Sequence, residues 1–349
     1  MKLREYGIEI GTLPTGKKNC ITDVIGVKVG HVTLDYPIDE SGDEYACTGV
    51  TAILPHGGNL FKQKVTAASY VLNGFGKTTG LVQLNELGLI ESPIMLTNTF
   101  GVPSVTQGTL QYMLENNPEI GDTTGTINIV VGECNDSYLN SIRLFPVKPE
   151  HAIEAIMKAS SNQAEEGDVG AGKGMVCFDY KGGIGSSSRV VNSGENGEYT
   201  VGCMVLSNFG DKEEFQFQRY FNQVNSNSTT LSKSTDGSII IVLATDAPLS
   251  DRQLLRVAKR CGIGLGRTGS HYSHGSGDII LAFSTAHLHP HVSNNSAIAH
   301  HQLREDHPVM NQLFVAAAES TEESILNSMT QAKTTKGRRG TIVEKLPFL

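Results

Sequence analysis

Residues 236–244, DGSIIIVLA, contain the sharpest change of character in this chain. The preceding residues 211–236 are polar, poor in aliphatic side chains and finally rich in Ser, Thr and Asn. A stretch of that composition buries little apolar surface, so we expect an exposed or mobile loop. Immediately after Gly237, Ser238 precedes six apolar residues that are typical of a buried strand. A polar loop is therefore predicted to end at a small residue at the start of a core strand.

The rest of the chain alternates short apolar runs, bounded by Gly, Asn and Asp, with segments whose apolar residues recur at helical spacing. The predicted strands are residues 126–131, 199–206, 238–244 and 278–283. The predicted helices are residues 105–115, 150–160, 250–261 and 308–330. In the third helix Asp251 lies in the first turn and Gly262 is expected to end the helix. We find no internal repeat and no domain linker, so residues 1–349 are predicted to form a single domain.

The composition is typical of a compact protein and gives no sign of binding to nucleic acid or to membranes. The 349 residues are 39% hydrophobic and 18% charged, which suffices for a sizeable core. A formal net charge of −8 gives no general reason to bind nucleic acid or an anionic membrane. The six cysteines are widely spaced, and several lie in apolar runs, where reduced cysteines pack as small core residues. The N-terminal residues lack the apolar core of a signal peptide, and we expect a cytoplasmic protein without membrane or nucleic-acid partners.

Two glycine-rich motifs resemble nucleotide-binding loops. GDVGAGKG at residues 167–174 is close to a phosphate loop, but Gly174 replaces the Ser or Thr that would ligate Mg²⁺. GIGLGRTG at residues 262–269 follows a predicted helix, whereas a dinucleotide fingerprint follows a strand. We interpret the first motif as a turn before a strand at residues 175–178, and the second as a helix end that leads into a turn. An uncleaved nucleotide- or ligand-binding protein remains an alternative function.

A group of histidines is the candidate metal site. His287, His289 and His291 occur in the sequence HLHPH, and His300 and His301 follow. In a strand the first two would share a face, and imidazoles bind zinc. No acidic or Cys ligand stands at a recognised spacing beside them. We therefore interpret the segment as a polar exit loop and predict neither a metal nor another cofactor.

Ser238 is the candidate nucleophile. No serine satisfies the G-x-S-x-G pattern of α/β-hydrolases, and Ser276 in HGSGD has flanking glycines without that spacing. If the Gly237–Ser238 bond is cut, Ser238 carries both a hydroxyl and a free α-amine, whose pKa of about 7.7–8.0 suits a general base. Gly237 leaves little bulk beside the scissile carbonyl. These residues favour a nucleophile that is created by cleavage between Gly237 and Ser238.

Several longer phrases support this hypothesis. They are NCITDVIGVKVGHVTL, TAILPHGGNLF, NGFGK, ELGLIESPIMLTNT, GAGKGMVCFDYKGGIGSSSR, DGSIIIVLATDAPL and GLGRTGS…SGDIILAFSTA. Together they resemble the L-aminopeptidase/D-esterase family of self-processing N-terminal-nucleophile peptidases, which is DmpA-like and includes the β-peptidyl aminopeptidases. The resemblance implies an α+β fold, a four-layer αββα sandwich that is Ntn-hydrolase-like with a different connectivity. It also implies that fragments 1–237 and 238–349 stay in one domain, and that processed protomers assemble as homo-oligomers, commonly tetramers.

The resemblance further implies roles for the cleaved Ser238 and its neighbours. Ser238 would attack the substrate carbonyl while its α-amine takes up the hydroxyl proton. Ser276 and Asp278 match an S-x-[DE] phrase of the family and would orient the amine. Many relatives carry Glu at the latter position, and the shorter Asp278 keeps the charge with less reach.

Three more residues are assigned by the resemblance. Asn208 in VLSNFG matches an oxyanion donor, and Tyr138 in GECNDSYLN matches a tyrosine near the substrate. Glu133 is the candidate for receiving the substrate ammonium group. The implied activity is that of an aminopeptidase or amidase acting on short peptides, amino-acid amides or esters through an acyl-enzyme on Ser238. The alternative enzyme is an acyltransferase of the ornithine acetyltransferase type, because an amine can replace water in releasing the acyl group.

Overall fold

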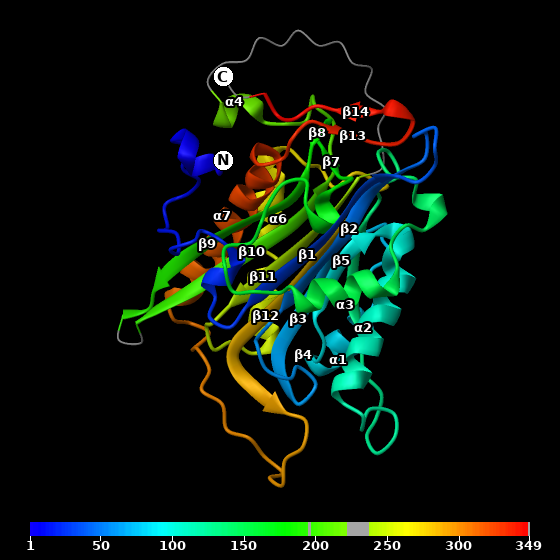
Figure 1. Ribbon diagram of the computed structural model, residues 1–349. Helices are drawn as coiled ribbons and strands as arrows, with labels where there is room; N and C mark the ends of the chain where they lie inside the picture. The colour runs from blue at the N-terminus through cyan, green and yellow to red at the C-terminus, as the bar shows by residue number, and fades with distance from the viewer. Residues whose placement is uncertain (195–196, 222–236, 348–349) are drawn as a thin grey trace.

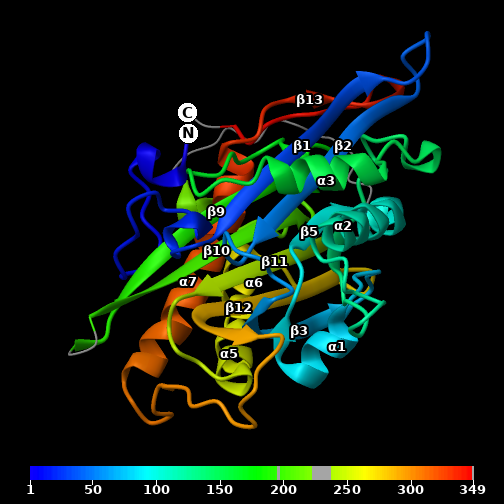
Figure 2. The same ribbon diagram turned by 60° about the horizontal axis from the view of Figure 1, so that its bottom comes forward.

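Two β-sheets lie face to face between layers of helices (Figures 1 and 2), in a computed structural model that describes residues 1–194, 197–221 and 237–347. The smaller sheet has the order β1-β2-β5-β6, and the larger has the order β4-β3-β12-β11-β10-β9. Helices α2 and α3 cover the smaller sheet, whereas α5, α6 and α7 lie on the side of the larger sheet. The predicted α+β, four-layer αββα architecture is confirmed.

The strands of the smaller sheet are β1 (Lys28–Pro37), β2 (Tyr45–Leu54), β5 (Ile94–Asn98) and β6 (Val130–Cys134). Those of the larger sheet are β3 (Gln63–Gly74), β4 (Leu89–Ile90), β9 (Gly183–Asn192), β10 (Glu198–Asn208), β11 (Ser238–Thr245) and β12 (Gly277–Pro290). Two short hairpins pair β7 (Val176–Cys177) with β8 (Tyr180–Lys181), and β13 (Thr335–Lys336) with β14 (Ile342–Val343). The helices are α1 (Leu81–Leu87), α2 (Val102–Asn116), α3 (Pro149–Met157), α4 (Phe217–Tyr220), α5 (Asp251–Ala258), α6 (Cys261–Thr268) and α7 (Val309–Thr330).

Strand β11 is buried on both faces, which explains its unbroken apolar sequence. Ile239 and Ile241 belong to the core between the larger sheet and its helices. Ile240 and Val242 belong to the core between the two sheets. Successive side chains of a strand point to opposite faces, so one run of sequence supplies both cores.

The central strands of the larger sheet bring three strand ends together. Strands β10 and β11 are antiparallel, with Asn208 opposite Ser238. Strands β11 and β12 are parallel, with Ser238 beside Gly277. The last residue of β10 and the first residues of β11 and β12 therefore meet at one edge of the sheet, where Ser238 lies in the middle.

Helix α7 carries carboxylates into the core, where they find cationic partners. Arg189 on β9 is fully buried and lies 3.1 Å from Glu319 and 2.7 Å from Glu323, measured between nitrogen and oxygen. Arg4 also pairs with Glu323, at 3.0 Å. Buried charges are tolerated when paired and hydrogen-bonded, so these contacts attach the N-terminal segment and β9 to α7.

Most of the predicted elements are confirmed, and the errors have local causes. The strand predicted at residues 126–131 is misplaced, since β6 begins only at Val130. The backbone N–H of Asn128 donates to the Glu91 side chain at 2.8 Å, and the Asn128 amide donates to the Gly80 carbonyl at 2.7 Å. The residues before Val130 are thus held by hydrogen bonds that involve side chains, and they do not pair with a neighbouring strand of the described chain.

Gly262 does not end the helix that was predicted at residues 250–261. Helix α5 ends at Ala258 and a second helix, α6, begins at Cys261 and includes the glycine-rich motif. A Cβ atom on Gly264 would lie 2.3 Å from the Ala318 carbonyl oxygen of α7. The glycine therefore permits close packing of α6 on α7, and the prediction of a helix end was wrong.

The polar segment 211–236 is only partly described, because residues 222–236 lie outside the described ranges. Its described part is only partly the exposed loop that was predicted, since Phe215, Tyr220 and Phe221 are buried in an aromatic cluster. The Tyr220 hydroxyl also donates to Glu322 at 2.8 Å. The burial of these aromatic residues holds this part against the protein despite its polar composition.

Among the residues that the structure describes, no helix is long and apolar enough to cross a membrane.

His31 on β1 is expected to make the fold acid-sensitive. Burial lowers the pKa of His31 from 6.5 to about 4, and its Nδ1 lies 2.9 Å from the Thr51 hydroxyl. The unfolded chain binds this proton first, so stability falls as the pH drops from 6.5 towards 4. Between about pH 7 and pH 4.5 the wild type should lose about 2–3 kcal/mol more unfolding free energy than His31→Gln. Denaturant titration at each pH measures the difference, with His301→Gln, at an exposed histidine, as the control. Equal pH dependence in wild type and His31→Gln would contradict the expectation.

Candidate active site

Ser238 and the carbonyl that precedes it share one hydrogen-bond donor. The backbone N–H of Gly277 lies 3.2 Å from Ser238 Oγ and 3.3 Å from the carbonyl oxygen of Gly237. The Ser238 side chain is buried. A hydroxyl and the carbonyl that it would attack are thus held beside an amide that can polarise the carbonyl.

Gly237 has no space for a side chain. A Cβ atom there would lie 2.5 Å from Phe209 Cα and 2.8 Å from the Asn208 carbonyl oxygen. Contacts this short to backbone atoms cannot be relieved by a change of rotamer. The absence of a side chain therefore lets the Gly237–Ser238 peptide bond lie directly against the end of β10.

Asp278 adds an incompletely satisfied carboxylate next to Gly277. Its Oδ1 accepts a hydrogen bond of 2.7 Å from the Ser276 hydroxyl, whereas its buried Oδ2 has no hydrogen-bond partner in the described part of the chain. Burial raises the pKa of Asp278 from 3.8 to about 6, and the Ser276 hydrogen bond opposes the rise. Buried polar atoms normally have partners, so Oδ2 is an unused acceptor in the described structure.

Asn208 faces Ser238 across the ladder, and its amide is oriented by two backbone groups. Its Oδ1 accepts from the Val176 N–H at 2.9 Å, and its Nδ2 donates to the Asn135 carbonyl at 3.0 Å. An amide nitrogen carries two hydrogens, and the Asn135 carbonyl takes one of them. The second hydrogen is available for another acceptor.

Glu133 is buried at the end of β6, and Tyr138 is exposed in the loop that follows. The Glu133 carboxylate accepts from the Lys77 N–H at 2.7 Å and from the Thr99 hydroxyl. A Cβ atom on Gly76 would lie 3.6 Å from Glu133 Oε1 and 3.7 Å from Gly277 Cα, which places Glu133 near the start of β12. Tyr138 has no hydrogen bond to the other candidate residues within the described ranges, and 44% of its surface is exposed.

The structure therefore gathers Ser238, Asn208, Ser276 and Asp278 at one edge of the sheet, with Glu133 nearby and Tyr138 in the adjoining loop. The Gly277 N–H and the Val176 N–H were not predicted from the sequence. Both are backbone groups, which any residue except proline carries. The glycine between Ser276 and Asp278 is the one sequence signal for the first, because a Cβ atom at Gly277 would lie 2.7 Å from the Phe75 carbonyl oxygen.

The first glycine-rich motif is confirmed as a turn. Gly170–Gly172 forms a 3₁₀ turn before β7, although the strand is shorter than predicted and ends at Cys177. The Lys173 ammonium lies 2.8 Å from Asp35 and 3.3 Å from Asp168. Two carboxylates already neutralise this lysine, so the motif does not present a free cation to a phosphate group.

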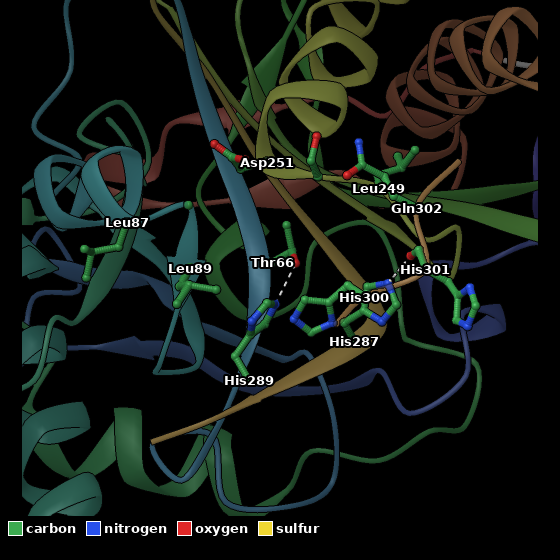
Figure 3. Close-up of a pocket in the computed structure, with 12 residues that line it drawn as sticks. Thr66, Leu87, Leu89, Leu249, Asp251, His287, His289, His300, His301 and Gln302 are labelled. Atoms are coloured by element: carbon green, nitrogen blue, oxygen red, sulfur yellow. Dashed lines mark hydrogen bonds between the residues drawn. The ribbon is translucent and has the colours of Figure 1, made fainter. Parts of the chain in front are cut away.

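Four of the five histidines, all except His291, line a pocket of about 260 Å³ at the other end of β12 (Figure 3). His287 and His289 belong to β12, so the prediction that they form an exit loop was wrong. Their rings lie 4.7 and 4.8 Å from the ring of His300. His289 Nε2 contacts the Thr66 hydroxyl at 2.9 Å, and His287 Nε2 contacts the His301 carbonyl at 2.6 Å. In the described residues, no three His, Cys, Asp or Glu side chains are arranged to hold a metal ion.

Comparison with known proteins identifies the family. The profile of peptidase family S58 matches residues 19–343. The chain belongs to this family. As an S58 peptidase it is a hydrolase, and its relatives include aminopeptidases.

Three relatives of this S58 peptidase illustrate the similarity. The β-peptidyl aminopeptidase BapA of Sphingosinicella microcystinivorans is 37% identical over 363 residues, which cover 99% of this chain and 89% of the relative. The crystal structure of the PH0078 protein from Pyrococcus horikoshii OT3 is 48% identical, with a TM-score of 0.90 and coverage of 99% and 96% of the two chains. The L-aminopeptidase D-Ala-esterase/amidase of Ochrobactrum anthropi, described as a variant of the Ntn hydrolase fold, is 32% identical, with a TM-score of 0.88 and coverage of 99% and 95%.

The hydrogen bond between Ser276 and Asp278 should lower the pKa of Asp278 measurably. In Ser276→Ala the carboxylate loses its hydroxyl donor, and the pKa should rise above the wild-type value of about 6. Titration of the Asp278 side-chain carbon by NMR measures both values. Ser273→Ala, at an exposed neighbouring serine, serves as the control and should leave the pKa unchanged. An equal or lower pKa in Ser276→Ala would show that the hydroxyl does not stabilise the charged carboxylate.

Proposed function

We propose that this S58 peptidase is a self-processing serine aminopeptidase, in which cleavage between Gly237 and Ser238 creates the nucleophile. One observation carries the proposal: the Gly277 N–H is within hydrogen-bonding distance of both Ser238 Oγ and the Gly237 carbonyl oxygen. The nucleophile and the bond to be cut are thus already together at a rigid strand end. Asp278, whose Oδ2 has no hydrogen-bond partner in the described residues, directly follows Gly277 in the chain.

Self-cleavage follows from this geometry as an acyl shift from nitrogen to oxygen. Ser238 Oγ attacks the Gly237 carbonyl carbon, and negative charge develops on the carbonyl oxygen that faces the Gly277 N–H. The carbon–nitrogen bond then breaks, and the hydroxyl proton ends on the departing nitrogen of Ser238. Water hydrolyses the resulting ester and leaves a Gly237 carboxylate, the Ser238 hydroxyl and a free α-amine.

Turnover of a substrate repeats the attack with the new amine as the base. The α-amine takes the proton from Ser238 Oγ as this oxygen attacks the substrate carbonyl. It then gives the proton to the departing amine or alcohol, and an acyl-enzyme remains. Water then releases the acyl group. Asn208 supplies an N–H to the oxyanion, and Asp278 with Ser276 holds the α-amine by accepting its hydrogen.

The proposed substrates are short peptides, amino-acid amides and esters with a free amino end. Glu133 is a buried carboxylate near the start of β12, where it offers a counter-charge for the substrate ammonium. Tyr138, in the adjoining exposed loop, would contact the part of the substrate that extends outwards. The names of the relatives, which include a β-peptidyl aminopeptidase and an L-aminopeptidase D-Ala-esterase/amidase, support this class.

We also infer the setting in which the enzyme acts. All six cysteines are free and buried, as expected for a protein of a reducing compartment, and this supports a cytoplasmic location. A single domain of interleaved fragments and assembly into tetramers stay predictions. The shared sheet supports the first, because β11 and β12 from the C-terminal fragment lie between β3 and β10 from the N-terminal fragment.

Replacing the nucleophile tests the proposal. Ser238→Ala should lower kcat for hydrolysis of an amino-acid amide by about 10³-fold or more, since both the hydroxyl and the cleavage that frees its amine are lost. Release of ammonia measures turnover, and gel analysis of the same samples measures cleavage. The exposed Ser161→Ala is the matched control and should retain both. Cleavage between residues 237 and 238 in the Ser238→Ala variant would rule out this serine as the nucleophile.

A further inference from the structure

Lys181, the last residue of β8, has a fully buried ammonium group that is held by carbonyl oxygens. Its Nζ donates to the carbonyls of Gly172, Met175 and Gly182 at 3.0, 2.8 and 2.8 Å. It forms no ion pair with a carboxylate in the described ranges of the chain. A buried charge without a counter-ion is costly, and proteins commonly keep such groups where their field has a use.

The Met175 carbonyl links this charge to Asn208. The peptide group that ends in the Met175 oxygen carries the Val176 N–H on its other side. That N–H donates to Asn208 Oδ1 at 2.9 Å. Starting at Lys181, the chain of donors and acceptors therefore runs through one backbone amide and one side-chain amide, and it ends at Asn208 Nδ2.

Each link of this chain strengthens the next in the same direction. The Lys181 ammonium beside the Met175 oxygen draws electron density towards that oxygen and makes the Val176 N–H a better donor. The stronger bond to Oδ1 makes the Asn208 Nδ2 hydrogens more positive. Hydrogen bonds in chains of this kind polarise one another, most of all where water is excluded.

We propose that Lys181 is a positioning residue of the active site, which orients and polarises the Asn208 amide through the Met175–Val176 peptide group. The inference rests on the proposed function, in which Asn208 donates to the oxyanion. Asn208 Nδ2 donates one hydrogen to the Asn135 carbonyl. The hydrogen-bond chain from Lys181 to Asn208, here called the relay, makes the other hydrogen a better donor.

The β7–β8 hairpin fixes the relay in place. Val176 pairs directly with Lys181 across the hairpin, so the ammonium folds back onto the start of its own hairpin. The two turn residues, Phe178 and Asp179, both have positive φ, at 51° and 60°. Phe178 is held there by ring contacts with Phe209 and Phe215, at centroid distances of 5.0 and 4.8 Å. A bulky residue in this conformation needs such support. Part of the support for Phe178 comes from Phe209, the residue that follows Asn208.

The relay is expected to depend on pH. Burial lowers the pKa of Lys181 from 10.5 to about 8. The titratable groups that act on it are Cys47 of β2, Cys177 of β7, and Asp168 and Lys173 of the preceding loop. Lys173 is already paired with Asp35 and Asp168, so it keeps its charge in the same range. Deprotonation of Lys181 above about pH 8 would remove the charge while the hairpin remains folded.

The test compares kcat of processed wild type and Lys181→Met with an amino-acid amide as substrate. At about pH 7 the wild type should be roughly tenfold faster, a smaller loss than the roughly 10²- to 10³-fold expected for removing an oxyanion donor in Asn208→Ala. Because the wild type loses the charge at high pH, the ratio of the two kcat values should approach one above about pH 9. Adding Lys181→Met to Asn208→Ala should cause little further loss.

Lys173→Met is the matched control, since its ammonium pairs with carboxylates and has no hydrogen bond to the hairpin carbonyls in the described structure. It should keep the fall of kcat with pH, with the midpoint moved only upwards, because the Lys173 charge contributes to lowering the pKa of Lys181. If Lys181→Met does not fold, the pH profiles of wild type and Asn208→Ala give the same answer. The kcat of the wild type divided by the kcat of Asn208→Ala should then fall as the pH rises through about 8.

Two results would overturn the inference. One is a ratio of wild type to Lys181→Met that stays constant with pH, which indicates a structural role only. The other is full additivity of Lys181→Met with Asn208→Ala. Failure of the proposed function looks different, because Asn208→Ala would then leave kcat unchanged or the wild type would not hydrolyse the amide.

Discussion

The pairing of β11 with its two neighbours is the constraint on which the site depends. Antiparallel pairing places Asn208 opposite Ser238, and parallel pairing places Gly277 beside it. These contacts are made by backbone groups of central strands, so they change little unless the sheet itself is disrupted. Ser238 is therefore held by the sheet and does not depend on a flexible loop for its position. The cores on both faces of β11 stabilise this arrangement through the burial of its isoleucines.

Polar groups close to the site are arranged by the backbone as much as by side chains. The Gly277 N–H faces the carbonyl before Ser238, and the Val176 N–H sets the direction of the Asn208 amide. Asp278 is the exception, because one of its oxygens has no partner in the described structure. In the proposed mechanism the fixed donors face the oxyanion, and the unsatisfied Asp278 oxygen accepts from the α-amine of Ser238. This combination connects the packing of the sheet to the proposed chemistry.

The sequence predicted β11 well because its two apolar faces leave an unbroken hydrophobic run. It also predicted α7, a helix of 22 residues whose apolar residues lie on both sides of the polar stretch 319–324. It did not predict α6, since glycines normally weaken a helix, and the close contact with α7 that requires Gly264 cannot be read from the sequence. Nor could it show that Phe215 is buried, because that depends on aromatic partners distant in sequence.

The candidate residues divide in the same way. Gly237 and Ser238 were indicated by the residues themselves, through the abrupt change from a polar sequence to an apolar run. The other candidates came from the resemblance to a family, because strand register decides which side chains meet and it cannot be read from one sequence. The Lys181 contacts depend on a hairpin whose two turn residues, Phe178 and Asp179, are not glycines. No turn motif in the sequence therefore predicts this hairpin.

The mass of the freshly purified, denatured protein, with N-terminal sequencing of any smaller fragment, tests the central claim most directly. Two chains are expected, of which the smaller begins Ser238-Ile239-Ile240. A single chain of 349 residues that stays intact on incubation and still hydrolyses amino-acid amides would contradict it. Catalysis would then proceed without a free α-amine on Ser238, and the N-terminal nucleophile would have to be abandoned.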